Sequence, residues 1–182
     1  MASPTASTTQ DLRYPVGKYK PPKQITAAER TEWLRELEEL PENLKRAVAG
    51  LDDRQLDTPY RPGGWTIRQV VHHLPDSHLN SYSRFRFALT EDAPAIKSYD
   101  EAAWAELADA KTAPIEMSLS LLAALHARWM TLLRSLSEAD LKRTIRHPEW
   151  GNINLDWMLG LYAWHSRHHV AHITSLREHE GW

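Results

Sequence analysis

The sequence NLDWMLGLYAWHSRHHVAHITSLREHEG, residues 154–181, predicts a long helix that begins after Asn154, a favourable N-cap residue, and ends at Gly181. Residues in a helix advance by about 100° each, so the face of every side chain follows from its position. On this scale many apolar residues of the segment share one stripe; they are Leu155, Met158, Leu161, Tyr162, Ile173 and Leu176. A stripe of this kind is the face that a helix buries against others in a bundle.

Three further segments have the same helical spacing of apolar residues. Residues 26–51 and 66–90 both open with a Thr-x-x-Glu/Gln capping box, and residues 114–136 open with a proline at a position that a first helical turn tolerates. Pro41 should kink or split the first of these helices, and Pro75 lies inside the second. Four long amphipathic helices predict an all-α fold, a four-helix bundle of up-and-down or crossover type.

The remaining segments are short or extended. Residues 1–10 are small and polar and predict a disordered N-terminal arm, followed by the Pro-rich extended segment YPVGKYKPP. Residues 11–182 are then one domain, since a chain of 182 residues is too short to favour two. A short helical piece is expected near residues 100–110. No segment predicts a clear strand hairpin, and residues 144–155 are the only β-like stretch.

Composition narrows the classes of function. The net charge is -2 and the charged residues are spread along the chain. The sequence therefore has no basic region for binding nucleic acid, and it indicates no membrane partner. The absence of cysteine excludes disulfides and thiolate ligands, and no apolar run is long enough to cross a membrane. We therefore expect a cytoplasmic protein. Most of the eight tryptophans are expected to fill the core.

Four of the ten histidines lie within residues 164–173. His165 is at the centre of the apolar stripe, His169 about 40° and His172 about 20° from it, while His168 is on the margin, about 60° away. A single inward histidine is usually an ordinary core residue. Two histidines four residues apart in one stripe can share a metal ion, which favours the pair His165 and His169.

A third ligand must come from another helix, and the segment 66–90 offers three histidines. His73 borders the apolar face and His78 lies within it, whereas His72 points away from it and is expected to face solvent. The pattern alone leaves His73 and His78 open, since Pro75 disturbs the helical geometry between them.

The motifs RPGGWTIRQVVHHLPDSH, ALHARW and YAWHSRHHVAHI together resemble the DinB superfamily, and in particular its YfiT-like branch of metal-dependent hydrolases and bacillithiol S-transferases. The resemblance covers almost the whole chain. It implies a four-helix bundle that binds one divalent ion through His73, His165 and His169. It also implies a homodimer.

Three neutral imidazoles without a carboxylate or thiolate leave the charge of the ion uncompensated, which strongly acidifies a bound water or thiol. We expect an enzyme that acts on a small molecule. The resemblance favours transfer of a small thiol of the bacillithiol type, and hydrolysis by activated water is the alternative. Zinc is the first expectation for the metal and nickel the second.

No catalytic side chain beyond the metal centre is assigned. His168, His172 and Asp76 are candidates to orient the ligands, although a solvated helix face is the plainer interpretation of Asp76. A third alternative is a non-catalytic metal-binding bundle, which would close the site with a fourth protein ligand, His172 or His78.

Overall fold

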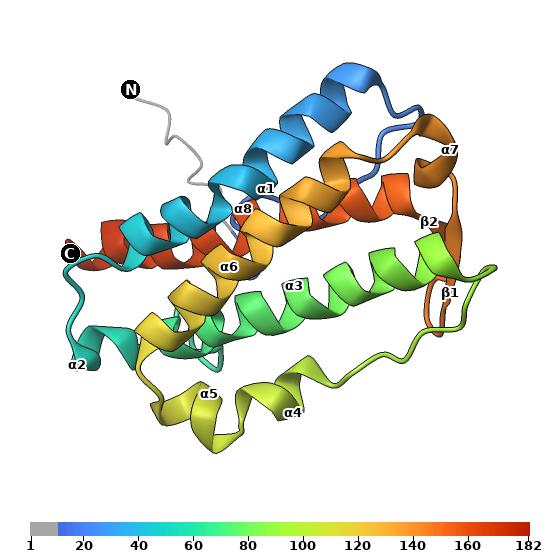
Figure 1. Cartoon of the computed structure of the whole chain (residues 1–182). Coiled ribbons are helices and arrows are strands. Elements are labelled where there is room, and N and C mark those ends of the chain that lie inside the picture. The colour runs from blue at the N-terminus through green and yellow to red at the C-terminus, as the bar shows by residue number, and fades with distance from the viewer. Residues whose placement is uncertain (1–10) are drawn as a thin grey trace, which may run out of the picture.

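Four long helices form the body of residues 11–182, the part of the chain that the computed structural model describes (Figure 1). They are α1 (Ala27–Val48), α3 (Ile67–Thr90), α6 (Ile115–Arg134) and α8 (Leu155–Glu180). The shorter elements are α2 (Asp53–Leu56), α4 (Glu101–Ala105), α5 (Ala108–Thr112), α7 (Glu138–Leu141), β1 (Thr144–His147) and β2 (Gly151–Asn154). The predicted all-α four-helix bundle is confirmed. The arm expected at residues 1–10 lies outside the described residues.

Side-chain caps start three of the long helices where the sequence predicts. Thr26 and Thr66 each accept a hydrogen bond from the third helical residue, whose side chain accepts one in return from the backbone of the threonine. Asn154 accepts a hydrogen bond from the backbone N–H of Trp157 and so caps α8. These caps satisfy N–H groups that have no partner within the helix.

Pro41 and Pro75 both lie inside uninterrupted helices, so the predicted split of the first helix at Pro41 is wrong. Each proline removes one backbone hydrogen bond from its helix. The packing on either side outweighs this loss, because Leu40 and Leu44 are almost completely buried. Pro41 also leaves the carbonyl of Leu37 without its usual partner four residues along α1.

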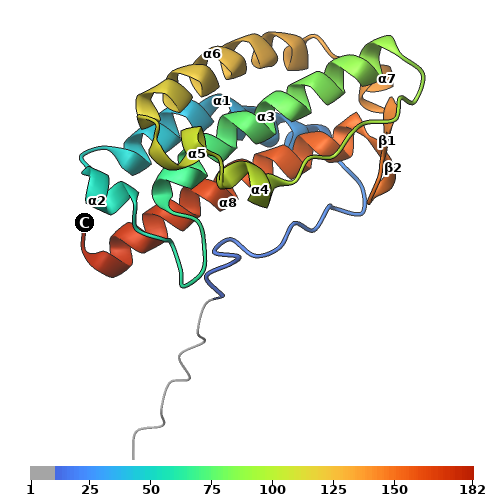
Figure 2. The same cartoon turned by 90° about the horizontal axis from the view of Figure 1, so that it is seen from below.

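The bundle is of the crossover type. α1 packs on α6 and α8, and α3 packs on the same two helices, which gives the cyclic order α1, α6, α3, α8. α3 and α6 run in the same direction, as do α1 and α8 (Figure 1). The chain must therefore return along the whole bundle between α3 and α6. This crossing segment, residues 91–114, carries α4 and α5, which lie against α3 (Figure 2).

A short antiparallel hairpin closes the end of the bundle at which α8 begins. β1 and β2 pair from Thr144 with Asn154 to His147 with Gly151. Gly151 has a φ of 67°, a conformation that glycine adopts without strain. The β-like stretch is thus a true hairpin, although the sequence does not predict one, because its alternation of polar and apolar residues is too short to stand out.

The extended N-terminal segment, residues 11–25, lies along α8 (Figure 2). The indole N–H of Trp164 donates to the carbonyl of Gly17 at 3.0 Å, and Nε2–H of His172 donates to the carbonyl of Arg13 at 3.3 Å. These contacts hold the N-terminal segment against the domain.

α1 and α8 approach each other closely at Gly160. A Cβ atom at this position would lie 2.7 Å from the hydroxyl oxygen of Tyr19 and 2.8 Å from the Trp33 ring. Alanine normally stabilises a helix by about 1 kcal/mol relative to glycine. At this contact the clash should dominate, so we expect Gly160→Ala to lower the free energy of unfolding by about 1–3 kcal/mol.

Urea denaturation measures this change, with Ser120→Ala on the exposed side of α6 as the control for helix propensity. A Gly160→Ala protein that is as stable as the Ser120→Ala protein would contradict the close approach.

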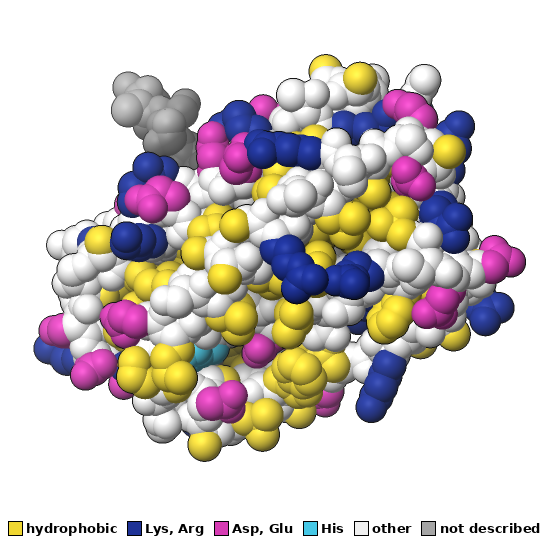
Figure 3. Space-filling view, viewed as in Figure 1, with side chains coloured by type: hydrophobic (Ala, Val, Ile, Leu, Met, Phe, Trp, Pro, Cys, Tyr) yellow, Lys and Arg dark blue, Asp and Glu magenta, His cyan; other side chains and the backbone are white. Residues whose placement is uncertain are grey.

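The surface mixes both signs of charge. On the face shown in Figure 3, lysine and arginine alternate with aspartate and glutamate, and apolar side chains are visible between them. Leu107, Met117 and Leu121 are among the exposed large apolar residues. None of the helices in residues 11–182 is long and apolar enough to cross a membrane.

Candidate metal centre

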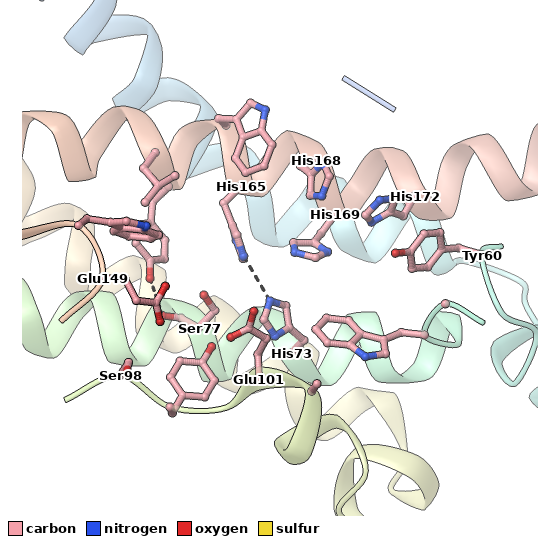
Figure 4. A pocket seen from close by; sticks show the side chains of 18 of the residues that line it. Tyr60, His73, Ser77, Ser98, Glu101, Glu149, His165, His168, His169 and His172 are labelled. Atoms are coloured by element: carbon pink, nitrogen blue, oxygen red, sulfur yellow. Dashed lines mark hydrogen bonds between the residues drawn. The ribbon is translucent and has the colours of Figure 1, made fainter. Parts of the chain in front are cut away.

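Three histidines from two helices meet at one point between α3 and α8 (Figure 4). His165 and His169 lie one turn apart on α8, and His73 faces them from α3. One ring nitrogen from each lies within 4.8 Å of the others. The structure thus brings together the three residues that the resemblance implies as ligands.

The distance between two of these rings fits a shared ion. Nε2 of His73 lies 3.2 Å from Nε2 of His165. Two nitrogens that are each about 2.0–2.1 Å from one tetrahedral ion lie roughly 3.4 Å apart. The third ring, that of His169, has a buried Nδ1 without a hydrogen-bond partner among the described residues. Spacing and donor set therefore fit a divalent ion.

The environment keeps the three rings neutral, as ligation requires. Burial lowers the pKa of His73 to about 3, and it lowers the pKa of His165 and of His169 well below the usual value. Neighbouring imidazoles act in the same direction because a second positive charge nearby is unfavourable. Protons therefore do not compete with a metal for these nitrogens at neutral pH.

The loop of residues 60–65, just before α3, packs the ring of Trp65 against two of the three histidines. The ring centre of Trp65 lies 4.7 Å from that of His73 and 6.2 Å from that of His169. A hydrogen bond from the Tyr60 N–H to the Trp65 carbonyl closes the loop, and Gly63 supplies its positive φ of 66°. Turn geometry accounts for the presence of glycines in this loop. The loop also forms one rim of the cleft described next.

His73, His165 and His169 line a cleft of about 520 Å³. Trp65, Trp150 and Trp164 contribute to its wall. Only Trp33 and Trp129 are buried in the core. The expectation that most tryptophans fill the core is met in part, because Trp65, Trp157 and Trp182 are partly buried against it, whereas Trp104, Trp150 and Trp164 are not among its residues.

The cleft also contains charged side chains from segments outside the four long helices. Glu101 belongs to α4 and Glu149 to the turn of the hairpin, and they are the two acidic residues of its lining (Figure 4). Arg61 and the buried Arg84 line it as well. Sequence analysis did not assign these residues, since they come together only when the crossing segment and the hairpin are in place.

His168 and His172 flank the metal centre on α8. The ring of His168 stacks on Trp164, and the ring of His172 stacks on Tyr60 with centres 4.0 Å apart. Both have a buried Nδ1 without a hydrogen-bond partner in the described part of the chain. Together with His169 they form a second, overlapping group with metal-ligand spacing.

Asp76 and His72 are on α3 but are not part of the cleft lining. Asp76 is half-buried, and burial together with Asp109 raises the pKa of its carboxyl to about 6. His72 is buried; its Nε2–H donates to the carbonyl of Ala113 at 3.1 Å, and its Nδ1 accepts from the hydroxyl of Ser118 at 2.7 Å. The expectation of a solvated His72 is wrong, because the end of the crossing segment and α6 cover this side of α3.

His78 and His126 lie behind His165, on the side away from His73. His78 contacts Nδ1 of His165, and His126 contacts His78 in turn. His78 is therefore not placed as a fourth ligand to the ion between His73 and His165. His126 was missed by sequence reasoning, although it is the one histidine in residues 115–134.

Sequence comparison identifies the class of protein. Residues 36–173 match the model of the DinB superfamily, and the chain belongs to this superfamily. It is 54% identical over 176 residues to "Putative metal-dependent hydrolase YfiT" of Bacillus subtilis, covering 96% of this chain and 99% of that protein. It is 56% identical over 173 residues to a Bacillus mycoides protein with the same description, covering 95% and 99% of the two chains.

A solved structure shares the fold. YfiT from Bacillus subtilis superposes with a TM-score of 0.91 at 55% sequence identity, covering 94% of this chain and 98% of that one. That protein is described as a probable metal-dependent hydrolase with an unusual four-helix bundle topology. The parallel pairs α1–α8 and α3–α6 found here are a departure from a simple up-and-down bundle.

Proposed function

We propose that this protein is a hydrolase that depends on one divalent metal ion, held by His73, His165 and His169. The observation that carries the proposal is the convergence of three neutral imidazoles at the wall of an open cleft. Among the described residues, no fourth side chain joins this group. Three protein ligands and an open position are typical of catalytic metal sites, whereas structural sites are closed by a fourth.

An ion bound there would supply a strongly acidified water as the nucleophile and a positive charge for the developing oxyanion. The side chains of the protein would bind the ion and position the substrate. The three histidines keep their lone pairs because burial holds them neutral. The indole walls of the cleft, among them Trp65 and Trp164, would pack against an apolar part of the substrate. Zinc is the metal that we test first, with nickel second.

Glu101 and Glu149 are the candidates for proton transfer, because they are the acidic side chains of the cleft lining. Replacing the one that moves the proton by glutamine should lower kcat by about 100- to 10,000-fold and leave the metal content unchanged. The other glutamate then serves as the matched control. Steady-state kinetics of Glu101→Gln and Glu149→Gln, with elemental analysis of both proteins, make the assignment. Two variants with wild-type kcat would exclude both residues.

The overall proposal is tested by an ester and amide hydrolysis panel on protein purified without a tag. We expect turnover that a chelator abolishes and that zinc or nickel restores. The same panel is run with bacillithiol, glutathione and cysteine against an electrophile. Turnover only in the presence of a thiol would support the thiol transfer that the resemblance favours and would refute hydrolysis. Bound metal without turnover in either assay would indicate a non-catalytic bundle.

The homodimer implied by the resemblance stays a prediction. Sedimentation velocity of the full chain would give the mass of the particle in solution, about twice 21.0 kDa for a dimer.

A further inference from the structure

Three histidines and one backbone carbonyl form a continuous chain of hydrogen bonds that starts at the metal centre and ends in α1. Nδ1 of His165 lies 3.2 Å from Nε2 of His78, and Nδ1 of His78 lies 2.9 Å from Nε2 of His126. Nδ1 of His126 lies 2.7 Å from the carbonyl oxygen of Leu37. The chain connects α8, α3, α6 and α1, so all four long helices take part.

The carbonyl at the end of the chain is available because of Pro41. In a helix, the oxygen of Leu37 would accept from the N–H of residue 41, but proline has none. A buried carbonyl without a partner is unfavourable. The Nδ1–H of His126, whose side chain is 2% exposed, satisfies it.

This carbonyl determines the position of every proton in the chain. A carbonyl oxygen only accepts, so His126 must carry its proton on Nδ1. A neutral imidazole has a single N–H, so Nε2 of His126 accepts and Nδ1 of His78 donates to it. By the same rule Nε2 of His78 accepts from Nδ1–H of His165. Nε2 of His165 is then left with a free lone pair.

The free lone pair is on the nitrogen that faces His73, 3.2 Å away. Nε2 is therefore the atom of His165 that can bind a metal. The opposite tautomers would place two N–H groups against each other at one of the contacts or leave the Leu37 carbonyl unsatisfied. The side chains of His78 and His126 are almost completely buried, an environment that favours neutral imidazoles.

We propose that His78 and His126 are positioning residues that hold His165 as its Nδ1–H tautomer, with Nε2 presented to the metal ion. The proposal rests on the metal centre proposed above. Partners of this kind fix the orientation of a ligating histidine and increase its basicity, and their loss typically weakens metal binding by about 10- to 100-fold. His126 would act on the ion through two intervening rings, those of His78 and His165.

The first test reads the tautomers directly in the metal-free protein. Long-range ¹H–¹⁵N correlation spectra of the histidine rings distinguish Nδ1–H from Nε2–H forms. We expect His78, His126 and His165 all to be in the Nδ1–H form at neutral pH. An Nε2–H form at any of the three positions would overturn the proposal. This measurement does not depend on bound metal, so it fails or succeeds separately from the proposed function.

The second test uses two substitutions of His126 and a control. His126→Leu removes the acceptor for His78, and we expect the dissociation constant for zinc to rise about 10- to 100-fold. His126→Gln restores an acceptor in its side-chain carbonyl, so its zinc affinity should stay close to that of the wild type. Leu133→Ala removes a buried side chain of α6 that is not part of the chain of histidines. It should lower stability without weakening zinc binding.

Competition with a chromophoric chelator gives the dissociation constants, and circular dichroism checks that each variant is folded. Unchanged zinc affinity in folded His126→Leu protein would refute the positioning role. An equal loss of zinc affinity in His126→Leu and His126→Gln would also refute it. If the wild type binds no zinc, the proposed function fails, while the tautomer spectra still support or refute the chain of hydrogen bonds.

Discussion

Replacing His73 with alanine should reduce the bound metal from about one ion per chain to almost none and abolish metal-dependent turnover, because two imidazoles cannot hold a divalent ion tightly. We expect the same result for His165→Ala. These two variants are informative because His73 and His165 belong to only one of the two histidine groups with metal-ligand spacing. His169 belongs to both, so its loss should remove the metal in either case.

His168→Ala and His172→Ala are the matched controls. Both residues are buried, lie on the same helix and flank the proposed ligands, but they belong only to the second group. Elemental analysis of the purified variants should give metal contents near that of the wild type. Loss of metal in these two variants, with metal retained in His73→Ala and His165→Ala, would show that the second group binds the ion instead.

Acid should destabilise the metal-free protein well above the pH at which unperturbed carboxylates are protonated. Burial lowers the pKa of His126 to about 4, against 6.5 for an unperturbed histidine. Below pH 6.5 the unfolded chain therefore binds more protons than the folded one, so stability falls as the pH falls and levels off near the folded pKa. For His126 alone this is about 2 kcal/mol between pH 7.5 and 5.

The pKa values of His73, His165 and His169 are lowered as well, so these three rings add to the effect. Asp76 opposes it, because burial raises the pKa of its carboxyl to about 6 and the folded state then gains protons between pH 6 and 4. Urea denaturation of chelated protein at pH 7.5 and pH 5 measures the net change. His126→Gln should reduce the difference between the two values. Equal stability of the wild type at both pH values would contradict the neutral burial of these histidines.

The sequence predicts those parts of the molecule that depend on local patterns. Caps at Thr26, Thr66 and Asn154 begin helices where they are expected, since a cap is decided by residues within one turn. The position of His165 and His169 within the apolar stripe of their helix follows from the helical period alone. The choice of His73 came from the resemblance, because the pattern left His78 equally open.

Features that depend on distant segments could not be predicted in this way. His72 is buried because residues near Ala113 and the side chain of Ser118 on α6 cover this part of α3. His78 belongs to the apolar face of α3, as the pattern indicates, but only the position of His126 on a third helix shows that its partner is His165. Pro41 predicts a kinked or split helix, but the helix is continuous, and a buried side chain from α6 satisfies the carbonyl that Pro41 leaves free.

The return path between α3 and α6 has a consequence for how substrate preference can change. Parallel helices require residues 91–114 to run the full length of the bundle, and this detour contributes Tyr99, Glu101 and Ala102 to the cleft while all three proposed ligands stay on the long helices. This part of the cleft wall thus lies on a different segment from the helices that carry the proposed ligands. Exchanging this stretch between relatives that keep Glu101 would be expected to change substrate selectivity and leave metal binding in place.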